Sequence, residues 1–170
     1  ILITTYICHP SLANNELSGP VVATSLAKYL IERKNNYYTY RFIFAPETIG
    51  AITYLSTNLE YLRKNVIAGY VLTCIGDSGP FSYLQSRTGN TLTDRATMHV
   101  LSNTEKKYKL YDFLSRGSDE RQYCSPGIDL PVGSLMRTKY GEYPEYHTLL
   151  DNFRLVTLKG CKGGFDVAKK

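Results

Sequence analysis

Four side chains capable of metal binding or acid–base chemistry each stand just past the end of an apolar, strand-like run. They are His9, Glu47, Asp77 and His147. Two imidazoles and a carboxylate form a ligand set that suits zinc, with one position left for water. Glu47 would then be free to act as a base towards that water. The pattern therefore predicts a metal-assisted hydrolytic site.

Each of these residue types also has an ordinary structural role. A histidine can cap a strand or tether a loop, a glutamate can complement the positive end of a helix dipole, and an aspartate can form a turn. A chance placement of all four at strand ends is less plausible than a shared site.

The apolar patterns alternate between strand and helix along the chain. Strand-like runs occur at 1–7, 38–45, 66–75, 81–87 and 130–136, and helical patterns at 19–34, from 47, at 92–103 and from 155. The run at 66–75 is nearly all apolar and is predicted to be central, whereas 81–87 is predicted to be a short edge strand. The stretch at 108–114 is ambiguous, and 118–120 predicts a helix cap.

This alternation predicts an α/β fold, a three-layer α/β/α sandwich with a mostly parallel, mixed central sheet. The carboxyl ends of parallel strands lie side by side at one edge of such a sheet, where open α/β sheets bind their ligands. The four candidate side chains should therefore gather at that edge.

The length and composition fit one domain over residues 1–170, because 170 residues with 43% hydrophobic content can bury one sizeable core. The chain starts inside a strand-like run, so we expect a fragment of a longer protein whose sheet needs further segments to cover it. No apolar run approaches the roughly 20 residues of a membrane helix. The four cysteines show no C-x-x-C spacing, and we expect a reducing, cytoplasmic location.

The net charge of +5 raises the possibility of nucleic-acid binding. However, the basic residues are dispersed and mostly fall at predicted helix ends, where they complement the helix dipole. The 15 tyrosines do not alternate with them as a stacking platform would. We therefore expect neither a nucleic-acid partner nor a membrane partner.

A rival motif occurs at 76–80, where Gly-Asp-Ser-Gly-Pro matches the nucleophile loop of trypsin-like serine proteases. His9 would be the base of such an enzyme. That fold consists of two β-barrels, and its chain order places an Asp between the His and the Ser. The alternation of strands and helices here disfavours this alternative.

Five motifs occur in order between positions 8 and 151. They are CHPSLANNELSG at 8–19, APETIG at 45–50, GD at 76–77, SDERQ at 118–122 and YHTLLD at 146–151. Together they resemble the M28 family of zinc aminopeptidases, most closely the bacterial aminopeptidase-like proteins encoded among surface-polysaccharide biosynthesis genes. The N-terminal strands of that family are absent here, and we expect more sequence at the C-terminus as well.

The resemblance implies roles for individual residues. Its metal ligands would be His9, Asp77 and His147, with Glu47 as the general base. Asn15 stands at the family's bridging position, where it would be a weak ligand, and Thr48 replaces a second Glu. Because both changes remove negative charge, we expect about one zinc ion per chain.

Other residues are expected around this centre. Glu16 could adjust to replace Asn15, and Asp151 is a candidate hydrogen-bond partner of the His147 imidazole. Tyr146 or Tyr140 could stabilise an oxyanion.

The resemblance implies a zinc-dependent aminopeptidase-like hydrolase. Its substrate would be a peptide or a small amino-acid amide with a free amino end, attacked by water whose proton Glu47 accepts. The alternative is a catalytically impaired M28-like binding or scaffold domain in a polysaccharide or cell-envelope pathway.

Overall fold

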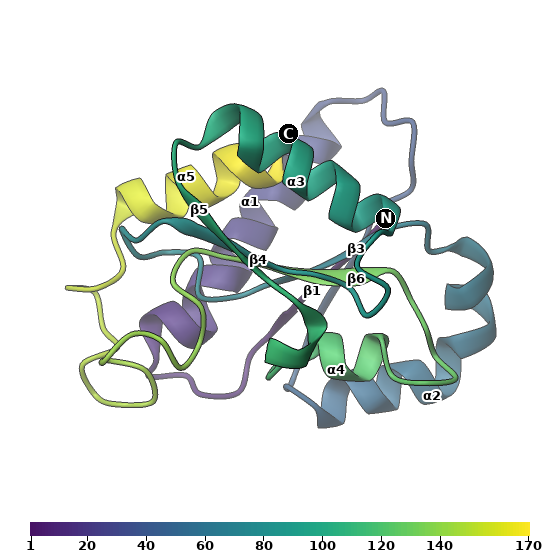
Figure 1. Ribbon diagram of the computed structural model, residues 1–170, viewed down its shortest axis with the longest axis horizontal. Helices are drawn as coiled ribbons and strands as arrows, with labels where there is room; N and C mark the ends of the chain where they lie inside the picture. The colour runs from purple at the N-terminus through teal and green to yellow at the C-terminus, as the bar shows by residue number, and fades with distance from the viewer.

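The computed structural model describes residues 1–170 and shows one six-stranded sheet between two layers of helices (Figure 1). The strands are β1 (Leu2–Tyr6), β2 (Arg41–Ala45), β3 (Gly69–Leu72), β4 (Phe81–Leu84), β5 (Tyr108–Tyr111) and β6 (Val132–Met136). Their order in the sheet is β2-β1-β3-β6-β4-β5. Every pairing is parallel except that of β4 with β6. The predicted α/β/α sandwich with a mostly parallel sheet and a central β3 is confirmed.

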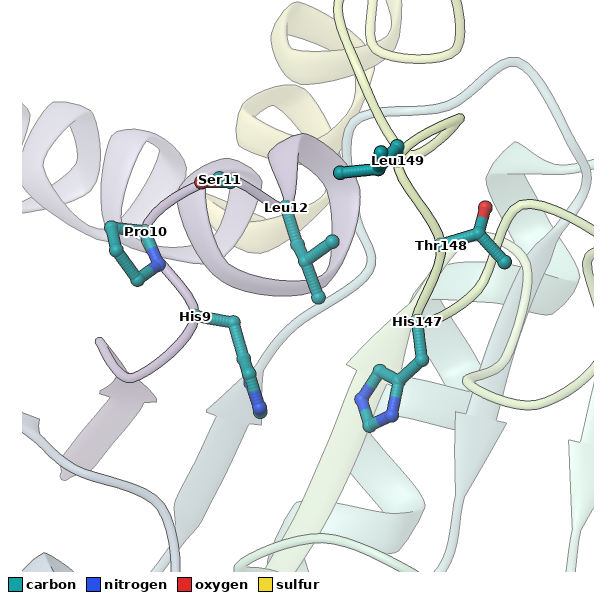
Figure 2. Close-up of a pocket in the computed structure, with 7 residues that line it drawn as sticks. All are labelled: His9, Pro10, Ser11, Leu12, His147, Thr148 and Leu149. Atoms are coloured by element: carbon teal, nitrogen blue, oxygen red, sulfur yellow. The ribbon is translucent and has the colours of Figure 1, made fainter.

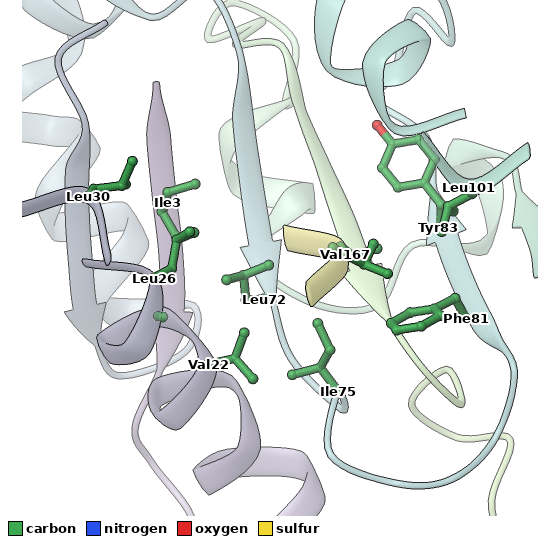
Figure 3. Close-up of a cluster of buried hydrophobic side chains, with 12 residues drawn as sticks. Ile3, Val22, Leu26, Leu30, Leu72, Ile75, Phe81, Tyr83, Leu101 and Val167 are labelled. Carbon is green, nitrogen blue, oxygen red and sulfur yellow. The ribbon is translucent and has the colours of Figure 1, made fainter. Parts of the chain in front are cut away.

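The two helical layers bury separate apolar cores. On one face lie α1 (Ser18–Glu32), α3 (Leu92–Thr104) and α5 (Leu158–Ala168), and on the other α2 (Ile49–Asn65) and α4 (Glu120–Tyr123) (Figure 1). In the first core, Leu26 of α1 and Val167 of α5 belong to the same buried cluster as Leu72 of β3 (Figure 3). In the second, Leu55 of α2 packs with Val71 of the same strand. No helix is both long and apolar enough to cross a bilayer.

The prediction of an edge strand at 81–87 is wrong. β4 lies between β6 and β5, and all four of its residues are buried. β5 forms the edge of the sheet next to β4 and lies within the ambiguous stretch at 108–114; β2 forms the opposite edge. A short 3₁₀ turn, η2 (Phe113–Ser115), follows β5. The sequence of β4 contains polar residues, which suggest exposure. They are buried because their hydroxyl groups have partners inside the protein: the Ser82 hydroxyl donates to Arg137 O and the Tyr83 hydroxyl to Asp94.

Glycines in α5 let this helix approach the loop after β3. A Cβ on Gly160 would lie 2.0 Å from the carbonyl oxygen of Gly76, which is backbone and cannot move aside. A Cβ on Gly163 would meet only the guanidinium of Arg137, which belongs to a side chain and not to the backbone. The glycines that weaken the helical pattern of α5 are thus explained by close packing.

We expect Gly160→Ala to lower the free energy of unfolding by about 1–3 kcal/mol, because the added methyl group overlaps backbone. Gly163→Ala is the matched control and should cost less, since only the Arg137 side chain has to shift and alanine favours the helix. Denaturant titration of both variants measures the difference. Equal stabilities would show that α5 can shift without cost.

Candidate active site

The carboxyl ends of the parallel strands bring two imidazoles together. His9 follows β1, and His147 lies in the loop after β6. Their ring centroids are 5.1 Å apart. Both rings extend to the same side of a pocket of about 470 Å³ that is otherwise lined by residues 10–12, 148 and 149 (Figure 2). The predicted convergence of the two histidines is therefore seen in the structure.

A buried carboxylate fixes the orientation of His9. Glu16 is 1% exposed, and its Oε1 lies 2.9 Å from His9 Nδ1. Its other oxygen accepts the backbone N–H of Cys8 at 2.7 Å. A carboxylate beside Nδ1 favours the tautomer in which that nitrogen carries the proton. The Nε2 atom of His9 is then left as the nitrogen able to bind a metal, an arrangement common around metal-bound histidines.

We expect Glu16→Gln to weaken zinc binding about tenfold, because a neutral amide holds the His9 tautomer less firmly. Calorimetric titration with zinc measures the change. The control is Glu145→Gln, which alters a residue two positions before His147 without touching His9. An unchanged affinity in the Glu16 variant would mean that this carboxylate does not set the donor atom of His9.

Another donor set exists around the first loop but is weaker. Cys8 Sγ, His9 Nδ1 and the Glu16 carboxylate lie within 4.8 Å of one another. Burial raises the pKa of the Cys8 thiol to about 11, so the thiol stays protonated near neutral pH. In this set the His9 donor is Nδ1, which is already paired with Glu16 Oε1 at 2.9 Å, and we therefore favour the donor set built on His9 Nε2.

Asn15 supplies an open oxygen beside Glu16. Residues 13–17 form a π-helical turn, η1 (Ala13–Leu17), a rare element that often occurs at functional sites. Asn15 is 3% exposed; its Nδ2 donates to the Tyr6 hydroxyl at 3.3 Å, and its Oδ1 has no hydrogen-bond partner. A buried acceptor without a partner is costly, and a cation would remove that cost. The paired imidazoles of His9 and His147 and the unpartnered oxygen of Asn15 are donor types that suit a metal such as zinc.

Asp77 lies at the predicted edge, but its carboxylate is already engaged. Oδ1 accepts from Gly79 N at 2.6 Å and Thr138 Oγ1 at 2.9 Å. Oδ2 accepts from Asn14 Nδ2 at 3.0 Å and Thr138 N at 3.1 Å. A metal bound here would have to displace some of these donors.

Glu47 lies next to the first loop, as a base acting at this site requires. Its backbone N–H donates to Cys8 Sγ at 3.3 Å. Burial raises the pKa of the Glu47 carboxyl above its usual value, and the nearby Glu16 carboxylate raises it further. A half-buried carboxylate with a raised pKa is suited to accepting a proton.

The remaining predicted residues separate into two groups. Tyr146 stacks on His147 with ring centroids 4.0 Å apart, and its hydroxyl makes no hydrogen bond within the chain. The Tyr140 hydroxyl donates instead to the buried Glu120 carboxylate at 2.8 Å, so Tyr140 is not available as an oxyanion donor. Between the two tyrosines, only Tyr146 can face a substrate.

The predicted hydrogen bond between Asp151 and His147 does not form. Its carboxylate accepts the backbone N–H groups of Asn14 at 2.6 Å and Asn15 at 3.0 Å, and the Tyr143 hydroxyl at 3.2 Å. It satisfies free N–H groups at the start of η1, a contact across more than 130 residues of sequence. The spacing of four residues from His147 gave no sign of this partner.

The sequence patterns do not indicate a buried carboxylate that lies near Glu47, that of Asp119. The motif at 118–120 predicts a helix cap, yet Asp119 makes no side-chain cap to α4. Its Oδ1 accepts the backbone N–H of Thr48 at 2.8 Å. Nothing in the local sequence distinguishes an Asp that caps its own helix from one that accepts a hydrogen bond from another segment.

The fold is shared with aminopeptidases of known structure. The aminopeptidase from Aneurinibacillus sp. strain AM-1 has a TM-score of 0.82 at 17% identity, over 99% of this chain and 42% of that chain. BSAP, a zinc aminopeptidase from Bacillus subtilis, has a TM-score of 0.78 at 16% identity, over 99% of this chain and 44% of that chain. These two likenesses establish the fold.

The chain belongs to the family described as a domain of unknown function, DUF4910, whose model matches residues 1–170. A Clostridium acetobutylicum protein, named as a polysaccharide biosynthesis protein with an aminopeptidase-like domain, is 51% identical over 165 residues. The match covers 97% of this chain and 37% of that protein. A crystal structure named as a peptidase from the same organism has a TM-score of 0.94 at 45% identity, over 99% of this chain and 39% of that one.

Proposed function

We propose that this chain is the M28-like catalytic domain of a zinc-dependent hydrolase that cleaves an amide at a free amino end. The observation that carries the proposal is the pairing of His9 and His147 at the strand ends, with Glu16 fixing one imidazole. The buried, unpartnered Asn15 Oδ1 supports a cation beside them. When bound, zinc would polarise a carbonyl group and lower the pKa of a water molecule.

The protein's own residues would supply the proton transfers and the positioning. Glu47 would accept a proton from the attacking water and pass it to the leaving amine. The Tyr146 hydroxyl would donate to the oxygen on which negative charge develops. Leu12 and Leu149, which line the pocket, would pack against the substrate side chain. The substrate would be a peptide or a small amino-acid amide.

A specific observation favours a second candidate, a catalytically impaired M28-like binding or scaffold domain. Asn15 offers a neutral oxygen, and all four hydrogen bonds to Asp77 occupy that carboxylate. Such a centre could bind a metal too weakly for turnover. The relative is named as a polysaccharide biosynthesis protein, so the binding partners of such a domain would belong to that pathway.

The two candidates are separated by metal content and activity of the full-length protein. We expect about one equivalent of zinc after dialysis, and hydrolysis of aminoacyl p-nitroanilides but not of their N-acetylated counterparts. A free amino end is what the hydrolase requires, so the acetylated substrates serve as the control. Absence of both zinc and hydrolysis would favour the scaffold domain.

A further inference from the structure

The segment that carries Glu47 contains a strained turn. Thr48 has φ of 61° and ψ of −68°, and Ile49 N donates to Glu47 O at 2.6 Å. This i to i+2 hydrogen bond and these angles define a γ-turn of the rarer, strained kind. A β-branched residue at positive φ is unfavourable and persists only when its surroundings hold it.

A single carboxylate holds the centre of this turn. Asp119 is 2% exposed, and its Oδ1 accepts the N–H of Thr48 at 2.8 Å. This is the only hydrogen bond that its carboxylate makes within the chain. Arg121 Nη2, from the same short helix, lies 3.5 Å from Thr48 Oγ1. Two residues of the 118–122 motif therefore contact the residue that follows Glu47.

The burial of Asp119 has no explanation in its own helix. The residue is the N-cap of α4 but makes no side-chain cap, whereas Asp112 caps η2 by accepting Leu114 N at 3.0 Å. Burial and the nearby Glu47 and Glu120 carboxylates raise the pKa of Asp119 to about 7. A carboxylate kept in so unfavourable a place serves the contact that it makes outside the helix.

We infer that Asp119 is a positioning residue for Glu47, holding the turn at Thr48 so that the Glu47 carboxylate is directed at the site. The inference rests on the proposed function for the role of Glu47 as base. Asp119, within the motif at 118–122, would thus affect catalysis without touching the reacting atoms. Misplacement of a catalytic group by about 1 Å can lower a rate by roughly 100-fold.

The test uses the full-length, zinc-loaded protein and the aminoacyl p-nitroanilide that it hydrolyses fastest. Asp119→Ala should lower kcat about 10- to 100-fold with KM and zinc content unchanged. Asp119→Asn, which keeps an oxygen able to accept the Thr48 N–H, should retain most of the rate. Adding Thr48→Gly to Asp119→Ala should restore much of kcat, because glycine adopts positive φ without strain. Asp112→Ala is the matched control and should leave kcat unchanged.

A second readout does not depend on substrate. Hydrogen exchange of the Thr48 amide should accelerate at least roughly tenfold in Asp119→Ala and not in Asp112→Ala. If the wild-type protein hydrolyses nothing, the proposed function fails, and exchange together with the crystallographic position of Glu47 in Asp119→Ala still decides the inference. An unchanged kcat in Asp119→Ala, or a loss that Thr48→Gly does not restore, would overturn it. The inference would also be overturned if, in Asp119→Ala, the Thr48 amide exchanged at the wild-type rate and Glu47 kept its crystallographic position.

Discussion

Replacement of Glu47 by Gln should lower kcat by about 10²- to 10⁴-fold while leaving zinc content unchanged. The amide cannot accept the proton of the attacking water, and general-base catalysis commonly contributes this much to a rate. Zinc binding should persist because the donors that fit the metal are on His9, His147 and Asn15. Steady-state kinetics and metal analysis of the same preparation measure both effects. Glu60→Gln, an exposed change in α2, is the control.

The pH dependence of the wild-type protein provides a second view of the same carboxyl. Glu47 must be deprotonated to act as a base, and burial raises its pKa above 4.5. Activity should therefore be present at neutral pH and be lost as the pH falls through that raised value. The residual activity of Glu47→Gln should lack this acidic limb. If the variant loses zinc as well as activity, Glu47 is a ligand and not the base.

Replacement of Asn15 by Asp should tighten zinc binding about 100-fold. The change adds a negative charge at a buried oxygen that has no hydrogen-bond partner. Even at an effective dielectric constant near 20, an opposite charge about 4 Å away is worth several kcal/mol. Calorimetric titration with zinc measures the gain. Asn152→Asp, which adds the same charge in the loop beyond His147, should change the affinity far less.

The wild-type protein should bind no more than one zinc ion per chain. Two ions roughly 3.5 Å apart repel strongly, and the family's bridging carboxylate is here the neutral Asn15. Two tight sites in the wild-type titration would contradict this account. No binding by the wild-type protein, together with no gain in Asn15→Asp, would support the scaffold domain.

Long-range architecture was predictable wherever burial left a clear apolar pattern. The run that contains β3 is apolar on both faces, so its central place followed directly. The places of β4 and β5 did not follow, because β4 buries hydroxyl groups that are satisfied by distant residues. The sequence of β5, Tyr-Lys-Leu-Tyr, is too short to distinguish a strand from a loop.

The candidate site was predictable in position but not in its hydrogen bonds. Strand ends placed His9, His147 and Glu47 near one another, because parallel strands end together. The partners of Asp77 and Asp151 come from segments far away in sequence, and no local spacing indicates them. The sequence likewise does not predict the turn at Thr48, since threonine rarely adopts positive φ.

The contact of Asp151 with η1 has a consequence for how the site can move. His147 and Asp151 lie in one loop, and three hydrogen bonds tie Asp151 to η1: two to its carboxylate and one from Ala13 N to its carbonyl oxygen at 2.9 Å. The loop that carries one imidazole is thereby fastened to the turn that carries Asn15 and Glu16. A displacement of this loop as a whole, without η1, would break all three bonds. Movement of this loop as a whole therefore requires η1 to travel with it, so that the two segments behave as one unit.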